Sequence, residues 1–101
     1  MMLITNSQKV KYFPLKFHLK QNYPNPFKGT TTINYHLPYK TKIRLIVIDF
    51  NGKIVEKLVS EKHNAGMYEV EFNSENLPEG IYFYQLIADH HFETKKMILV
   101  K

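Results

Sequence analysis

The sequence predicts an all-β fold, an antiparallel β-sandwich of about seven strands. Apolar and polar residues alternate with a period of two in several short runs, and turn signals separate these runs about every 8–12 residues. No stretch shows a convincing helical period. The chain has 101 residues, which is the size of one domain with one core. We therefore expect a tail or linker over residues 1–14 and a sandwich over residues 15–101.

Two strands are predicted in the first third of the chain. In the first, Leu15, Phe17 and Leu19 share one face, and polar side chains occupy the other. The second begins at a run of three threonines and continues to residue 37, with Ile33, Tyr35 and Leu37 on its apolar face; Pro38 ends it. Threonine favours extended backbone because branching at Cβ restricts its side-chain torsion.

A stiff connector is predicted between these strands, at residues 21–27. Pro24 and Pro26 fix φ at two positions and lack an N–H, so the segment is unsuited to a central strand. An ordinary loop would also explain it. The aromatic rings of Tyr23 and Phe27 indicate that the segment packs against the end of the domain.

The middle of the chain predicts a β-hairpin. Residues 42–50 are apolar on both faces and β-branched, as in a central strand. Asn51-Gly52 follows, and this pair favours a type I′ turn, so residues 53–59 should form the antiparallel neighbour. The outward side chains Ile46 and Ile48 need a cover, which a neighbour in the sheet would supply in part; any remainder would be an apolar contact patch.

Three further strands are predicted after this hairpin. A polar loop at residues 61–66 ends in Gly66, and Tyr68 begins a strand whose carboxylates, Glu69 and Glu71, face solvent. The next break ends at Gly80 and leads into a strand over residues 81–88, and after a turn the last strand covers roughly residues 92–100.

One local pattern indicates an immunoglobulin-like sandwich. Leu77, Gly80 and Tyr82 have the spacing of a tyrosine corner, in which a tyrosine hydroxyl bonds back to the preceding corner. A plain core tyrosine is the alternative for Tyr82. Antibody domains have a cysteine two residues further on, where this chain has Tyr84, so packing must replace the disulfide.

The composition narrows the possible partners. The formal net charge is +5, but 13 of the 14 basic residues are scattered lysines and Arg44 is the single arginine, so we expect a solvated basic surface and no nucleic-acid partner. The chain lacks cysteine, which removes disulfides and thiolate sites. No run approaches the length of a membrane span, and residues 1–7 do not form a signal peptide.

We predict no catalysis, no metal or other cofactor and no small-molecule substrate. Ser60 and Ser74 lie outside any nucleophile elbow, and the adjacent His90 and His91 read as a solvated turn with Asp89. The four glycines are all explained by turns.

With catalysis excluded, we expect the domain to bind a partner, and the terminal strand is a candidate binding surface. A final strand can be an exposed edge that pairs with another strand, although its lysines can equally serve only to prevent aggregation. The residues concerned are Thr94, Lys95, Lys96, Met97, Ile98, Leu99, Val100 and Lys101.

An ordered set of motifs resembles the type A C-terminal sorting domain of the bacterial type IX secretion system. The opening motif is Gln21, Asn22, Tyr23, Pro24, Asn25, Pro26 and Phe27, followed by the threonine-led strand. Ile43 to Asp49 with Asn51-Gly52, Ala65 to Tyr68, Leu77 to Leu86 and Thr94 to Met97 continue the likeness in collinear order over about residues 17–101. Lys28-Gly29 departs from the family, which tends to have Asn-Pro there.

The resemblance implies an immunoglobulin-like domain without activity of its own. Such domains sit at the C-terminus of secreted proteins and address a covalently fused upstream cargo to the outer-membrane export machinery and the cell surface. A sortase usually removes the domain, here upstream of about Phe17. By analogy, the terminal strand with Lys95, Lys96 and Lys101 is the part that the export machinery recognises.

Two interpretations stay open at this point. Because the chain shows neither a cargo nor a signal peptide, we expect an excised or truncated terminal domain. The alternative is a structural or adhesive immunoglobulin-like module: a spacer, a carbohydrate-binding accessory or a domain like that of the flagellar hook-cap protein.

Overall fold

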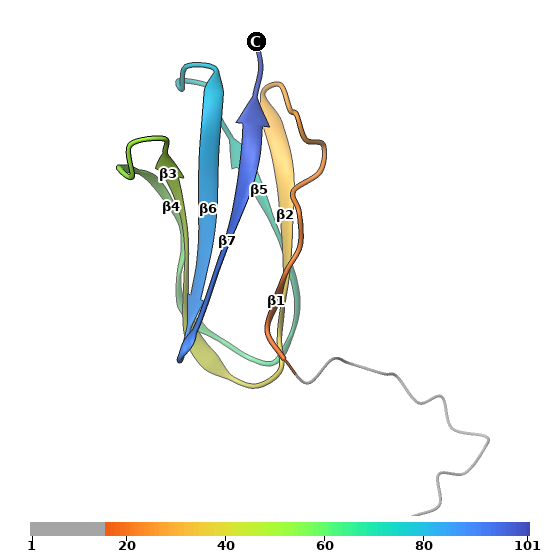
Figure 1. Ribbon diagram of the computed structural model, residues 1–101. Coiled ribbons are helices and arrows are strands. Elements are labelled where there is room, and N and C mark those ends of the chain that lie inside the picture. The colour runs from red at the N-terminus through yellow and green to blue at the C-terminus, as the bar shows by residue number, and fades with distance from the viewer. Residues whose placement is uncertain (1–15) are drawn as a thin grey trace, which may run out of the picture.

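The computed structural model describes residues 16–101, which form seven antiparallel strands in two sheets (Figure 1). The order is β1-β2-β5 in one sheet and β4-β3-β6-β7 in the other. The predicted all-β sandwich is thereby confirmed. The predicted tail and Leu15 lie outside the described residues. The strands are β1 (His18–Leu19), β2 (Thr30–Leu37), β3 (Thr41–Asp49), β4 (Ile54–His63), β5 (Gly66–Asn73), β6 (Gly80–Ala88) and β7 (His91–Leu99).

The strand order is that of an immunoglobulin-like sandwich. The first, second and fifth strands lie in one sheet and the third, sixth and seventh lie in the other, as in immunoglobulin domains, whereas β4 pairs with β3 and does not join the first sheet as it does in the constant type. The described chain starts beside β1 at the end of the sandwich opposite the C-terminus (Figure 1). Whatever precedes the domain therefore joins it far from Lys101.

The core lies between the two sheets and includes Leu19, Ile33, Tyr35 and Leu37, which the alternation predicted to share the apolar faces of their strands. Its buried members are Leu19, Phe27, Ile33, Tyr35, Leu37, Ile43, Leu45, Val47, Phe72, Tyr82, Tyr84, Leu86, Ala88, Met97 and Leu99. Two details differ from the prediction. Only His18 and Leu19 pair with β2, so the first strand is shorter, and His36 on the polar face of β2 is buried, with Nδ1 3.1 Å from the Lys16 carbonyl oxygen.

The hairpin between β3 and β4 has the predicted pairing but not the predicted turn. Of its residues, Gly52 alone has a positive φ, of 88°, whereas a type I′ turn would need one at Asn51 as well. The Asp49 carboxylate accepts the N–H groups of Asn51 and Lys53, and Gly52 donates to the Asp49 carbonyl. This side chain stabilises a longer turn, which explains why the dipeptide rule failed.

The predicted polar loop at residues 61–66 is mostly strand, because β4 continues to His63, paired with Thr41. The His63 ring stacks on Tyr68 with centroids 4.4 Å apart, and Tyr68 stacks on Tyr35. This stack connects His63 to the core residue Tyr35. The Tyr68 hydroxyl donates to the Asn64 carbonyl and holds the short turn into β5.

The predicted tyrosine corner is confirmed. The Tyr82 hydroxyl at the start of β6 donates to the Pro78 carbonyl at 2.6 Å, and the Tyr82 side chain lies in the core. The bond fixes the crossing of the chain from one sheet to the other, just before Gly80.

Replacing Tyr82 by Phe should lower the free energy of unfolding by about 1 kcal/mol, because the Pro78 carbonyl loses its partner. Tyr23→Phe is the matched control, since the Tyr23 side chain is exposed. Urea titration of both variants measures the effect. Equal stability losses in the two variants would contradict a role for the corner bond.

Candidate recognition site at the terminal strand

The terminal strand β7 presents only part of the predicted recognition segment to solvent. Met97 and Leu99 point into the core and are buried. Thr94 and Lys96 are exposed, and Lys101 extends beyond the end of the strand. The segment over residues 94–101 is therefore partly core and partly surface.

The proline-containing connector lies along the free edge of β7 (Figure 1). The Phe27 N–H donates to the Ile98 carbonyl and the Val100 N–H donates to the Phe27 carbonyl, both at 2.9 Å. These two bonds form a parallel bridge between Phe27 and Leu99. The Phe27 ring is buried and meets Phe72 edge-on, so the connector is also fixed to the other sheet through the core.

Two side chains of the connector extend this contact. Asn25 Oδ1 accepts the Ile98 N–H at 2.9 Å, and Gln21 Nε2 donates to the Lys96 carbonyl at 2.7 Å. Edge strands expose unpaired N–H and C=O groups that attract other strands. The connector occupies those groups at Ile98, so the expected exposed edge is wrong for this part of β7.

A buried tyrosine joins the start of the connector to the core. The Tyr84 hydroxyl donates to the Lys20 carbonyl at 2.6 Å and accepts the Asn22 N–H at 2.7 Å. Burial raises the pKa of Tyr84 above its ordinary value, although the bond from Asn22 acts in the opposite direction. Asn22, also buried, donates to Pro24 and to Thr31.

One expectation for the connector is wrong. Tyr23 was expected to anchor the segment, but its side chain is 79% exposed while Phe27 is 1% exposed. The main chain of Tyr23 pairs with Thr32 instead, through two bonds of 3.0 Å. The peptide bonds preceding Pro24 and Pro26 are both cis. The sequence did not predict that Asn22 anchors the connector, because its buried hydrogen-bond partners are known only from the structure.

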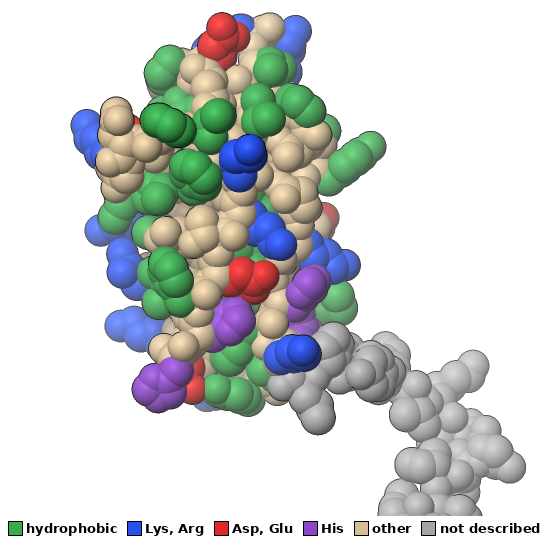
Figure 2. All heavy atoms as spheres, in the orientation of Figure 1, with side chains coloured by type: hydrophobic (Ala, Val, Ile, Leu, Met, Phe, Trp, Pro, Cys, Tyr) green, Lys and Arg blue, Asp and Glu red, His purple; other side chains and the backbone are tan. Residues whose placement is uncertain are grey.

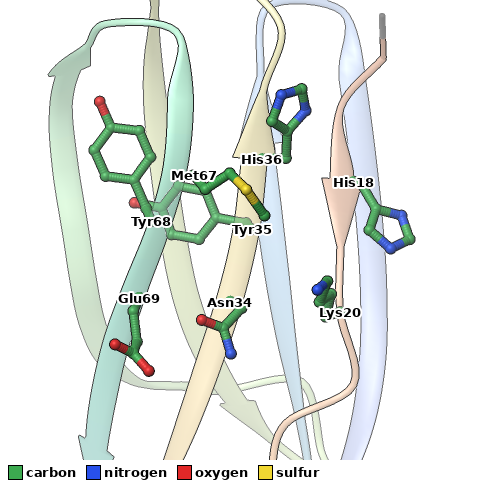
Figure 3. Close-up of a pocket in the computed structure, with 8 residues that line it drawn as sticks. All are labelled: His18, Lys20, Asn34, Tyr35, His36, Met67, Tyr68 and Glu69. Carbon is green, nitrogen blue, oxygen red and sulfur yellow. The ribbon is translucent and has the colours of Figure 1, made fainter. Parts of the chain in front are cut away.

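A hollow on the outer surface of the β1-β2-β5 sheet is the other candidate site (Figure 3). It measures about 420 Å³ and is lined mainly by polar strand residues, including His18, His36 and Glu69. Tyr35 contributes little surface because its ring lies in the core. Ligand pockets are predominantly apolar with a few convergent polar groups, whereas polar and apolar surface line this hollow in roughly equal parts.

Among residues 16–101, no group of three potential metal ligands comes together. Within the same range, the structure has no helix long and apolar enough to cross a membrane.

The two sheets and the bridge between the connector and β7 define an immunoglobulin-like β-sandwich domain. A family model described as the secretion system C-terminal sorting domain matches residues 21–101. The chain belongs to this family of type IX secretion sorting domains. The family is non-catalytic. Membership implies that the domain interacts with the secretion machinery and that the protein is exported to the cell surface.

A solved structure of dimeric latent PorU from Porphyromonas gingivalis has a similar fold. It matches with a TM-score of 0.66 and 18% identity, over 83% of this chain and 9% of that chain. At this identity the similarity concerns the fold alone, and this chain spans only a small part of the length of PorU. A search of curated proteins gave no match.

Replacing Asn22 by Ala should lower the free energy of unfolding by about 1–3 kcal/mol, because the buried bonds to Pro24 and Thr31 are lost. Asn76→Ala, at an exposed turn position, is the control and should change stability by less than about 0.5 kcal/mol. Denaturant unfolding monitored by tyrosine fluorescence provides the measurement. A similar loss in both variants would argue against the buried network.

Stability should fall as the pH rises above about 10, in part because of Tyr84. Its folded pKa is raised, so the unfolded chain releases the proton first and the Tyr84 contribution is lost as pH increases. For Tyr84→Phe, the decline between pH 10 and 11 should be shallower by at most about 1.4 kcal/mol per pH unit. Parallel slopes for the wild type and this variant in pH-dependent urea titrations would refute the assignment.

Proposed function

We propose that this domain directs a covalently attached upstream cargo across the outer membrane by type IX secretion and to the cell surface. The match of the sorting-domain family over residues 21–101 carries the proposal. The partners are the outer-membrane export components and a sortase that releases the domain upstream of about Phe17. Since pairing with β2 begins only at His18, such a cut leaves the strands intact.

The signal is assigned to the exposed part of residues 94–101. Thr94, Lys96 and Lys101 present their side chains to solvent, whereas Met97 and Leu99 stabilise the core. The fused cargo would leave this surface accessible, because the chain enters the sandwich at the opposite end (Figure 1). The proposed partner therefore recognises exposed side chains of a folded strand and of the residue that extends beyond it.

A fusion of the whole chain to a periplasm-targeted reporter, in a bacterium with type IX secretion, should reach the cell surface. Combined Thr94→Ala, Lys96→Ala and Lys101→Ala changes should reduce surface delivery about tenfold, which corresponds to about 1.4 kcal/mol of binding free energy. Surface protease accessibility of the reporter, together with its periplasmic level, measures delivery.

The matched control carries the same types of change at exposed positions away from β7: Thr30→Ala, Lys40→Ala and Lys53→Ala. Equal delivery by the two triple variants would contradict the assignment of the signal. A folded wild-type fusion that stays in the periplasm would instead support a structural or adhesive module. Point changes are preferable to deletion of residues 95–101, because that deletion removes Met97 and Leu99 from the core.

A further inference from the structure

The outward surface of the β4-β3-β6-β7 sheet, here called the outer face, carries a contiguous apolar cluster. The register places Ile48 between Ile54 on β4 and Phe83 on β6, and it places Ile81 opposite Ile98. Neighbouring residues on these strands point into the core instead. Ile54 and Ile81 are 42% and 36% exposed, and no described segment covers them. Figure 2 shows hydrophobic side chains gathered over the upper part of β6 and β7.

The outer face is also uniformly basic. The register places five cations on it and no carboxylate from the four strands: Lys42, Arg44, Lys57, Lys62 and Lys96. The outward surface of the other sheet differs, since it carries Glu69 and Glu71. The concentration of positive charge is therefore a property of this face and does not follow from the net charge alone.

The fold gives no reason for this arrangement. Lys42 and Lys62 lie directly opposite each other across β3 and β4, and like charges in that position are destabilising. Lysines on edge strands protect against aggregation, which would explain Lys57 and Lys96. Arg44 lies on β3, which has a partner on both edges, so edge protection does not explain it.

We propose that the outer face binds an apolar protein surface bordered by carboxylates, on the type IX export machinery. This inference rests on the proposed sorting function and specifies the chemical character of the partner's surface. Basic side chains interspersed with apolar ones require complementary acids in the partner. Ile46, Ile48, Phe83 and Ile98 lie largely buried in the plane of the sheet, which suits a flat protein surface. Insertion into a lipid bilayer would need a cluster of apolar side chains that project together from the surface. Phe92, which is 61% exposed, projects from this face by itself, in the row of Ile87 and Arg44.

Charge reversal on the outer face tests the proposal in the whole-chain reporter fusion. Arg44→Glu, Lys57→Glu and Lys62→Glu together, all outside residues 94–101, should reduce surface delivery at least about tenfold and leave the reporter in the periplasm. The control, Lys20→Glu, Lys28→Glu and Lys40→Glu, changes the net charge equally outside the outer face and should stay within about twofold of wild type. Circular dichroism and thermal unfolding of the free chains check that both variants fold.

Three outcomes would overturn the proposal. Normal delivery of the outer-face variant would refute the outer face as a partner-binding surface but would not contradict the sorting function. An equal loss in the control shows that net charge alone matters. Failure of the wild-type fusion removes the sorting function and this inference with it.

A second measurement does not depend on charge reversal. A photo-crosslinking residue at Ile81 should form a protein adduct that disappears in a strain lacking the type IX export complex. The same residue at Met67, which is 62% exposed on the other sheet, should not. Adducts of equal yield from both positions would contradict the proposal. Binding to phosphatidylglycerol-phosphatidylcholine vesicles would be measured as well. If the wild type binds them and the charge-reversal variant does not, the partner is an anionic lipid surface and the proposed protein partner is wrong.

Discussion

The structure depends on the attachment of the connector, residues 21–27, to the last two strands. Antibody domains join their sheets by a disulfide, whereas this chain has Tyr84 at the corresponding position of the tyrosine-corner pattern. The Tyr84 hydroxyl bonds to Lys20 and Asn22, which follow β1, and so connects β6 to the opposite sheet. Phe27 makes a second connection through the core. A cysteine-free domain thereby obtains its cross-sheet link from a buried hydroxyl and an aromatic ring.

Attachment of the connector also determines how the edge of the sheet meets solvent. A terminal strand with open N–H and C=O groups would pair with strands of other molecules. Asn25 and Phe27 occupy the groups of Ile98, and Gln21 occupies the carbonyl of Lys96. At the other edge of that sheet, β4 has two register irregularities against β3, which interrupt a regular pairing template. Recognition of β7 by strand addition is consequently blocked near the C-terminus, and side-chain recognition is favoured.

The sequence predicted the sandwich because alternation depends only on nearest neighbours along the chain. Ile33, Tyr35 and Leu37 are buried as the period of two requires. The predictions failed where a distant or side-chain partner decided the outcome. Asp49 changed the turn at Asn51, and Tyr68 extended β4 to His63. Contacts between the connector and β7 join residues more than 70 positions apart, and no local pattern specifies them.

The same contacts explain why the opening motif and the terminal strand occur together in one sorting domain. If Lys96 and Lys101 belong to the surface that the export machinery recognises, their positions depend on the main chain of β7. Gln21, Asn25 and Phe27 hold that main chain from its free side. The motif then acts as a positioning element for the signal, although it is distant in sequence. Under the proposed function, recognition and folding would be coupled: a change in the connector should weaken export by displacing β7, without removing any side chain that the partner contacts. Mutations in the motif and mutations of exposed β7 side chains should therefore differ in whether they also lower stability.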